Sequence, residues 1–238
     1  MRRYIDLGID SRIQGLKGLE EMIGIACSMY FAVLGVKLDP RTGSQGIELL
    51  RRLSPKYDVD LVPRVDLMPR SRTHLLRELG ECRDIFEVIA VRVASEHLYK
   101  LAVQDDRVDL ISLASKASAE AFSPSVAKLI APNGKTVEIE LGCLILSKGR
   151  NRVDLLYEMS RRISLAKRFQ ANLVISSGAV DKYLIRSPLD LASMACILPM
   201  KFTEALDSLS TIPGTIVDRN QARLSPRHIS PGVELTEV

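Results

Sequence analysis

The sequence predicts an α/β barrel, in which about seven parallel strands are surrounded by helices. Two observations predict it: near-continuous apolar runs recur along the chain, and segments with apolar residues at helical spacing lie between them. The length of 238 residues suits one such domain, because a single α/β barrel commonly fills about 200 to 250 residues. We expect one barrel domain over residues 1–223 and a loose tail over residues 224–238, where apolar residues are few.

The expected strands are mostly continuous apolar runs, as in parallel sheets that are covered by helices. They span residues 3–9, 30–38, 58–67, 84–93, 108–113, 137–146 and 171–177. Repeated strand–helix units form either an open doubly wound sheet or a closed barrel, and the pattern alone does not separate the two. No G-x-G-x-x-G motif follows the first strand, which weakens the dinucleotide-binding form of the open sheet and favours the barrel.

The segments between these runs are long enough to serve as crossover helices. The expected helices span residues 16–29, 44–54, 71–83, 95–105 and 152–170. Ser44, Ser71 and Ser95 are candidate N-caps, because a hydroxyl there can accept from an otherwise unpaired backbone N–H. After Pro188 the chain reads as helices only, which we expect to pack on the outside of the barrel.

The composition is that of an ordinary globular protein with an uneven charge distribution. A hydrophobic fraction of 46% with 26% charged residues argues against a fibrous or largely disordered chain. The formal net charge is only +4, but seven basic residues meet two acidic ones between Lys148 and Arg168. The four cysteines form no C-x-x-C pair, and no signal peptide or long apolar run occurs, so we expect reduced thiols and a cytoplasmic protein.

The loops after the strands of a parallel barrel share one face, which usually carries the functional residues. We expect these positions to form a cationic rim that holds phosphate oxygens through charge-assisted hydrogen bonds. For each single residue the alternative is a solvated loop end. The rim positions are Asp10, Arg12, Lys37, Asp39, Arg64, Asp66, Arg92, Ser112, Lys116, Lys148, Arg150, Ser176 and Ser177.

The sequence is poorly supplied for metal-dependent or nucleophilic catalysis. His74 and His97 fall on expected helices and His228 falls in the tail, so no histidine is placed at a strand end. Ser176 and Ser177 have no visible base beside them. With five Phe, six Tyr and no Trp, stacking on unpaired bases is disfavoured, and recognition of RNA shape and phosphates is favoured.

Three segments resemble the barrel-shaped protein subunit of archaeal and eukaryotic ribonuclease P. They are YIDLGI (4–9), FEVIAVRVASEHLYKLAVQDDRVDLISL (86–113) and NLVISSGAVDKYLIRSPLDLA (172–192), and the similarity extends over about residues 3–223. The resemblance implies a TIM-like barrel related to polymerase-and-histidinol-phosphatase (PHP) domains. It also implies a role within a ribonucleoprotein endoribonuclease whose RNA removes the 5′ leader from precursor tRNA.

The resemblance also implies partners and the loss of metal chemistry. In the related phosphoesterases the first strand ends in D-x-H-x-H, but the matching residues here are Asp6, Gly8 and Asp10, so both histidines are missing. We therefore expect no cofactor bound by this chain, with magnesium used by the partner RNA, and no catalytic activity of the chain alone. The implied partners are ribonuclease P RNA, a small α/β protein subunit and further ribonuclease P proteins, and precursor tRNA through the holoenzyme, with no membrane.

These considerations yield a set of RNA-binding candidates and two competing functions. The alternatives are a metal-dependent phosphoesterase of the PHP type with Asp6, Asp10 and Asp66 as ligands, and a structural protein that never touches RNA. The basic residues of the 152–170 helix are better explained as an ordinary solvated face. The RNA-binding candidates, with no catalytic residue among them, are Arg64, Arg92, Lys148, Arg150, Arg152, Ser176, Ser177 and Arg186.

Overall fold

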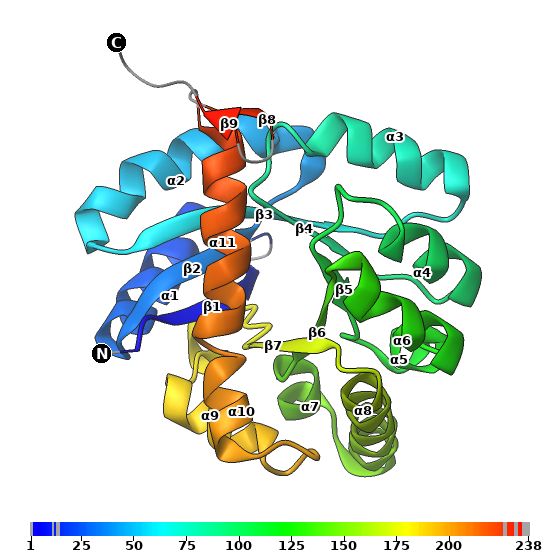
Figure 1. Cartoon of the computed structure of the whole chain (residues 1–238). Helices are drawn as coiled ribbons and strands as arrows, with labels where there is room; N and C mark the ends of the chain where they lie inside the picture. The colour runs from blue at the N-terminus through cyan, green and yellow to red at the C-terminus, as the bar shows by residue number, and fades with distance from the viewer. Residues whose placement is uncertain (1, 11, 13–14, 226–227, 231–232, 235–238) are drawn as a thin grey trace.

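Seven parallel strands form the centre of the computed structural model, in the order in which they follow one another along the chain (Figure 1). The structure describes residues 2–10, 12, 15–225, 228–230 and 233–234. The predicted TIM-like barrel is confirmed. Its strands are β1 (Tyr4–Asp10), β2 (Phe31–Lys37), β3 (Asp60–Leu67), β4 (Val88–Val91), β5 (Leu110–Ser112), β6 (Thr136–Glu140) and β7 (Asn172–Ser176).

The barrel is nearly closed by a loop between its first and last strands. We call the end at which the strands finish the mouth, and the end at which they begin the base. Near the beginning of β1, the amide of Ile5 donates to the carbonyl of Leu209 at 2.8 Å, and near the end of β7, the amide of Ile175 donates to the carbonyl of Ser208 at 3.1 Å. Residues 208–209 therefore supply the backbone acceptors that a further strand would offer between β7 and β1.

Helices follow the strands, and all but the last, α11, lie around the outside of the barrel (Figure 1). They are α1 (Gly15–Ser28), α2 (Gly43–Tyr57), α3 (Arg72–Cys82), α4 (Glu96–Val103), α5 (Lys116–Ala121), α6 (Pro124–Ile130), α7 (Gly142–Leu146), α8 (Gly149–Arg168), α9 (Pro188–Ala195), α10 (Phe202–Asp207) and α11 (Thr211–Leu224). Short 3-10 turns are η1 (Pro40–Thr42), η2 (Ala131–Asn133) and η3 (Lys182–Leu184).

Two of the three predicted N-caps are confirmed. The Ser71 hydroxyl accepts from the amide of His74 at 3.2 Å, and the Ser95 hydroxyl accepts from the amide of Leu98 at 3.4 Å. The prediction for Ser44 is wrong, because α2 already begins at Gly43, directly after η1.

The prediction of one long strand over residues 137–146 is also wrong. Strand β6 ends at Glu140, and the apolar residues after it form the short helix α7. The turn depends on Gly142, whose amide donates to the carbonyl of Ser177 at 2.7 Å. A Cβ at this glycine would lie 2.6 Å from the same carbonyl oxygen, so only glycine allows this approach. A continuous apolar run does not distinguish a buried strand from a buried helix.

The last long helix does not pack on the outside, contrary to the prediction. Helix α11 crosses the barrel in front of the strands (Figure 1). Its Ile216 and Val217 are buried in the same cluster as Ile5 and Val62 from the beginnings of β1 and β3. Helix α11 thus closes the base with apolar side chains.

The barrel interior changes from apolar at the base to ionised at the mouth. Alternate residues of a strand point to the same side, so Val62, Arg64 and Asp66 of β3 follow one another up the interior. The apolar cluster near the base comprises Ile5, Leu7, Val33, Val62, Val88, Ala90, Leu110, Val174, Ile216 and Val217.

The tail over residues 224–238 is only partly described. It contains a small antiparallel pair, β8 (His228–Ser230) and β9 (Val233–Glu234). Residues 226–227, 231–232 and 235–238, for which a loose tail was predicted, lie outside the described residues. Within the described part of the chain, no helix is both long and apolar enough to cross a membrane.

Candidate functional site

An ion cluster of five side chains fills the barrel interior just below the mouth. Its members are Lys37, Arg64, Asp66, Glu138 and Glu140, all of them buried. The Lys37 ammonium lies 2.5 Å from a Glu140 oxygen and 3.1 Å from an Asp66 oxygen. The Arg64 guanidinium lies 2.7 Å from Asp66 through Nε and pairs with both oxygens of Glu138. Lys37 therefore bridges two carboxylates, and Arg64, which also lies 3.6 Å from Glu140, contacts three.

Strand register brings these residues together from distant parts of the sequence. Lys37 of β2 lies beside Arg64 of β3, and Glu140 of β6 lies beside Ser176 of β7. Because residues two apart share a face, Glu138 joins Glu140 in the interior. The Ser176 hydroxyl donates to Glu138 at 2.8 Å, so a neutral group also stabilises this carboxylate.

Burial and pairing act in opposite directions on the ionisation of this cluster. Burial alone disfavours the carboxylate of Asp66, but Arg64 and Lys37 outweigh it and hold the pKa of Asp66 below its ordinary value. Glu138 behaves in the same way, since burial is outweighed by Arg64 and its pKa is lowered. For Glu140, burial prevails over the attraction of Lys37, and its pKa is raised. The cluster is thus held by charges that depend on one another.

Asp6 and Asp10, the remaining acidic residues of the barrel interior, accept from donors of this chain, although the buried Oδ2 of Asp6 has no hydrogen-bond partner among the described residues. Asp6 accepts from the amide of Gly8 at 3.0 Å and from the amide of Ser177 at 2.9 Å, and burial raises its pKa. Asp10 is held by both Nε and Nη2 of Arg12, at 2.8 and 2.5 Å. These contacts tie the end of β1 to the loop after β7 and to the residues that follow β1.

The carboxylates of the mouth do not fit a divalent metal ion. The positions between Asp66, Glu138 and Glu140 are taken by the ammonium of Lys37 and the guanidinium of Arg64. In the parts of the chain that the structure describes, no group of three or more His, Cys, Asp or Glu residues is placed to hold a metal. Two cations of the chain itself, Lys37 and Arg64, therefore pair with all three carboxylates.

Three predicted RNA-binding residues lie inside the barrel. Arg64, Ser176 and Ser177 each have 0% of their surface exposed. Arg64 directs its donors at Asp66, Glu138 and the carbonyl of Leu7, so these donors do not face solvent. The prediction of a predominantly cationic mouth is wrong, because carboxylates pair with the cations throughout its interior.

The other predicted residues lie nearer the surface. Arg92 is half-buried, with one nitrogen 3.6 Å from the Met68 sulfur. Arg186 is also half-buried and donates to the carbonyls of Tyr183 and Ile185 at 2.7 and 2.8 Å. Contact of Arg92 and Arg186 with RNA stays a prediction.

The exposed cations of the predicted set meet where α8 begins. Lys148 is exposed at the N-cap of α8, and the Arg150 side chain is 88% exposed, with Nε 3.1 Å from Asp154. Arg152 is exposed but donates to the carbonyls of Ser147 and Ile145 at the end of α7. Lys116 at the start of α5 lies 3.5 Å from Asp154. We call Lys116, Lys148, Arg150 and Arg152 the α8 corner.

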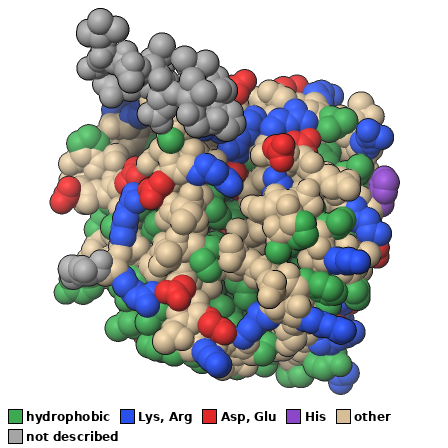
Figure 2. Space-filling model, viewed as in Figure 1, with side chains coloured by type: hydrophobic (Ala, Val, Ile, Leu, Met, Phe, Trp, Pro, Cys, Tyr) green, Lys and Arg blue, Asp and Glu red, His purple; other side chains and the backbone are tan. Residues whose placement is uncertain are grey.

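The rest of α8 carries paired charges, which agrees with the interpretation of its basic residues as an ordinary solvated helix face. Arg161 and Arg162 both contact Glu158, and Lys167 lies 2.6 Å from Glu204. On the face crossed by α11, basic and acidic side chains are likewise interspersed (Figure 2). At the α8 corner Lys116 and Arg150 likewise share one carboxylate, that of Asp154. The corner differs in its two further exposed cations, since Arg152 donates to backbone carbonyls and Lys148 is exposed at the N-cap.

Glu138 and Glu140 are the central residues that sequence reasoning missed. The signal was present: in T-V-E-I-E, over residues 136–140, both acidic residues occupy the same face of a strand that was expected to be buried. Buried carboxylates require a cation or several donors, so this pattern could have predicted their pairing with Lys37 and Arg64.

Together, these features define a class: an α/β barrel whose mouth is filled by internal ion pairs. The model of one family, described as RNase P subunit p30, matches residues 24–225. The chain belongs to the ribonuclease P subunit p30 family.

Similar proteins span most of the chain. Ribonuclease P protein component 3 of Methanosarcina barkeri is 28% identical over 173 residues, which cover 73% of this chain and 72% of the relative. The protein of the same name from Methanococcoides burtonii is 24% identical and covers 99% of this chain and 95% of the relative.

Solved structures share the fold. A chain in the cryo-EM structure of archaeal ribonuclease P with mature tRNA matches with a TM-score of 0.85 at 20% identity, over 98% of both chains. A crystal structure of an amidohydrolase matches with a TM-score of 0.60 at 10% identity, over 93% of this chain and 75% of that one.

Proposed function

We propose that this chain is the barrel subunit of a ribonuclease P ribonucleoprotein, in which RNA removes the 5′ leader of precursor tRNA. The chain itself supplies no catalytic group. Its membership of the p30 family carries the first statement. The ion cluster supports the second, because Lys37 and Arg64 occupy the acceptors that a catalytic cation would need.

A metal-dependent phosphoesterase is the weaker candidate. Its three expected ligands all accept from donors of this chain: Asp6 from backbone amides, Asp10 from Arg12, and Asp66 from Arg64. Binding a metal there would first require breaking these contacts, several of them buried. Magnesium therefore belongs to the partner RNA in this proposal, and this chain binds no cofactor.

We assign the RNA contact to the α8 corner. Phosphate contacts need exposed cations, and Lys148 and Arg150 are the exposed members of the predicted set whose donors are least engaged by the chain. The N-terminus of α8 adds backbone amides and a favourable helix dipole beside Lys148. A small α/β protein subunit and further ribonuclease P proteins complete the proposed cytoplasmic particle.

Reconstitution tests the subunit role. Ribonuclease P RNA is assembled with its proteins, with or without this chain, and cleavage of precursor tRNA is measured over a range of magnesium concentrations. We expect the chain alone to cleave nothing and its omission to lower activity most at low magnesium. Unchanged activity on omission would remove the proposal.

Charge reversal tests the proposed RNA surface. In Lys148→Glu/Arg150→Glu, we expect the slope of log binding constant against log salt to become shallower by about 1.4 to 1.8, for two lost phosphate contacts. Arg72→Glu/Arg77→Glu, on the exposed face of α3, is the control with the same change in net charge. Equal slopes for the wild type and the α8 variant would point to protein contacts only at this corner.

A further inference from the structure

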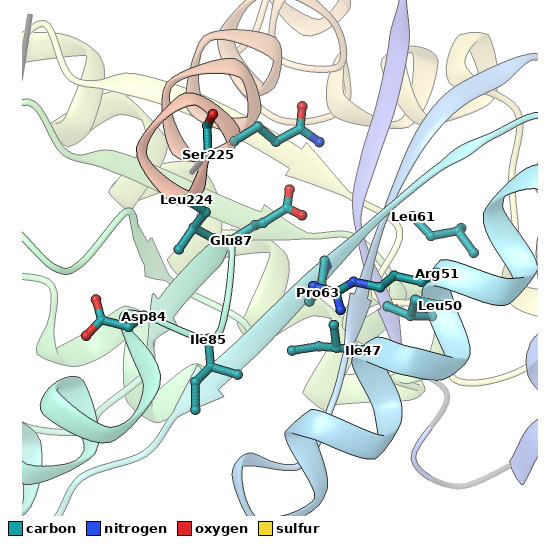
Figure 3. A pocket seen from close by; sticks show the side chains of 11 residues that line it. Ile47, Leu50, Arg51, Leu61, Pro63, Asp84, Ile85, Glu87, Leu224 and Ser225 are labelled. Atoms are coloured by element: carbon teal, nitrogen blue, oxygen red, sulfur yellow. The ribbon is translucent and has the colours of Figure 1, made fainter. Parts of the chain in front are cut away.

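A pocket with a volume of about 300 Å³ opens on the side of the barrel toward the base. It lies between α2, the first half of β3, the turn before β4 and the end of α11 (Figure 3). Its walls combine apolar side chains, among them Ile47, Pro63, Ile85 and Leu224, with polar and charged ones. The pocket is separate from the ion cluster, whose residues do not line it.

Glu87 places a carboxylate oxygen without a hydrogen-bond partner among the described residues in this pocket. Its Oε2 atom is buried and has no hydrogen-bond partner in the structure. The side-chain amide of Gln221 lies nearby but donates to Asp60 at 2.9 Å. Burial outweighs a hydrogen bond from Gln221 and, with the charge of Asp60 adding to it, raises the pKa of Glu87 to about 7. An unpaired buried carboxylate is costly, so the pocket lacks a donor that would complete it.

The nearest cation of this chain does not supply that donor. Arg51 and Glu87 enter the pocket from opposite sides (Figure 3). The Arg51 side chain is 75% exposed, and the ion pair it makes is with Glu48, at 4.0 Å. Asp84 adds a second carboxylate to the lining, and this one is exposed. The acidic groups of the lining thus outnumber its one cation.

We propose that this pocket binds an arginine or lysine side chain of a protein partner. The alkyl stem lies along the apolar walls, and the cationic head pairs with Glu87. The volume suits one long side chain. RNA is the less suitable occupant, because its phosphates would approach the carboxylates of Asp84 and Glu87. The site goes beyond the proposed RNA contact and lies on another part of the barrel.

Small probes test the chemistry on the isolated full-length chain. n-Butylguanidinium carries the proposed stem and head, and n-butylurea is its neutral counterpart of nearly equal shape. Binding is followed at pH 8 by NMR, through the methyl signals of Ile47, Ile85 and Leu224. We expect saturable shifts with the guanidinium and at least fivefold weaker binding of the urea. Equal affinity of the two probes would overturn the proposal.

A pair of matched variants assigns the effect to one carboxylate. Glu87→Gln keeps the side-chain shape and removes the charge, whereas Glu48→Gln removes an exposed carboxylate of α2 that does not line the pocket. We expect Glu87→Gln to weaken binding of butylguanidinium at least fivefold without affecting butylurea, and Glu48→Gln to change neither. Unaltered guanidinium binding by Glu87→Gln would overturn the assignment.

Crosslinking identifies the source of the side chain. A photoreactive phenylalanine replaces Ile85, which is 40% exposed at the pocket, and the assembled ribonuclease P particle is irradiated. A crosslink to an arginine- or lysine-containing peptide of another protein supports the proposal. Crosslinks to RNA or to residues 226–238 of this chain, or no crosslink, overturn it. This arm rests on the proposed function, but the NMR arm uses the chain alone, so the two failures are distinguishable.

Discussion

The two ends of the barrel interior are filled by different kinds of side chain. At the base they are apolar residues such as Val62, which Ile216 of α11 covers. Just below the mouth they are ion pairs around Arg64. Apolar burial is non-directional and stabilises the fold without a specific partner. The ion pairs stabilise only as a complete set, because each buried charge depends on its neighbour. The base therefore contributes stability, and the mouth contributes a fixed arrangement that leaves its acidic groups few free acceptors.

The sharpest test of this contrast removes one member of the ion cluster. We expect Arg64→Leu to lower the free energy of unfolding by about 3 to 5 kcal/mol, because Glu138 loses its cation inside the barrel and Asp66 keeps only Lys37. Urea denaturation at pH 7 measures the loss. Arg64→Leu/Glu138→Leu should cost less than the sum of the two single changes, and strict additivity would contradict a coupled cluster.

At the base, truncating an apolar side chain should lower the free energy of unfolding by less than the loss of Arg64 does. The loss should not depend on the ionisation of a neighbouring group. Ile216→Ala, at a side chain that is 5% exposed, is expected to lose about 3 kcal/mol through lost burial and the remaining cavity. The same denaturation assay at pH 5 and pH 8 should give equal losses. A loss that varied strongly with pH would mean that the two ends of the barrel are not energetically separate.

Acid should affect the mouth before the base. The folded-state pKa of Asp66 is lowered, so its stabilisation is complete above its ordinary pKa of about 4 and is lost as the pH falls further. We expect a contribution on the order of 2 kcal/mol to disappear in this range. Denaturation curves of the wild type and Arg64→Leu should converge as the pH falls, and a constant difference would refute the role of Asp66.

The smallest expected effect has the opposite sign. The folded-state pKa of Glu87 is raised to about 7, so the folded state holds its proton more tightly and stability falls as the pH rises from about 4.5 to 7. Glu87→Gln should therefore stabilise the protein at pH 8 by about 1 kcal/mol, a figure reduced for the partial exposure of this side chain. Thermal unfolding at pH 8 and pH 4 measures it, and destabilisation at pH 8 would show a donor for Glu87.

The sequence by itself determined the local features of this protein. Apolar runs predicted all seven strands of the sheet in order, and the hydroxyls of Ser71 and Ser95 marked the starts of α3 and α4. The three motifs at residues 4–9, 86–113 and 172–192 also indicated the family that the comparison confirms. These features depend on periodicity and on contacts within a few residues, which a linear pattern records.

Only the tertiary structure decided the fate of the charges and of the last helix. Arg64 and Glu138 lie 74 residues apart in sequence, and Lys37 and Glu140 lie 103 apart, yet they pair inside the barrel. The positions of Lys37 and Arg64 near strand ends indicated an exposed cationic rim. The sequence does not record which carboxylates the strand register brings beside these two cations. The placement of α11 across the base followed from the same cause, since barrel closure sets which apolar surface remains to be covered.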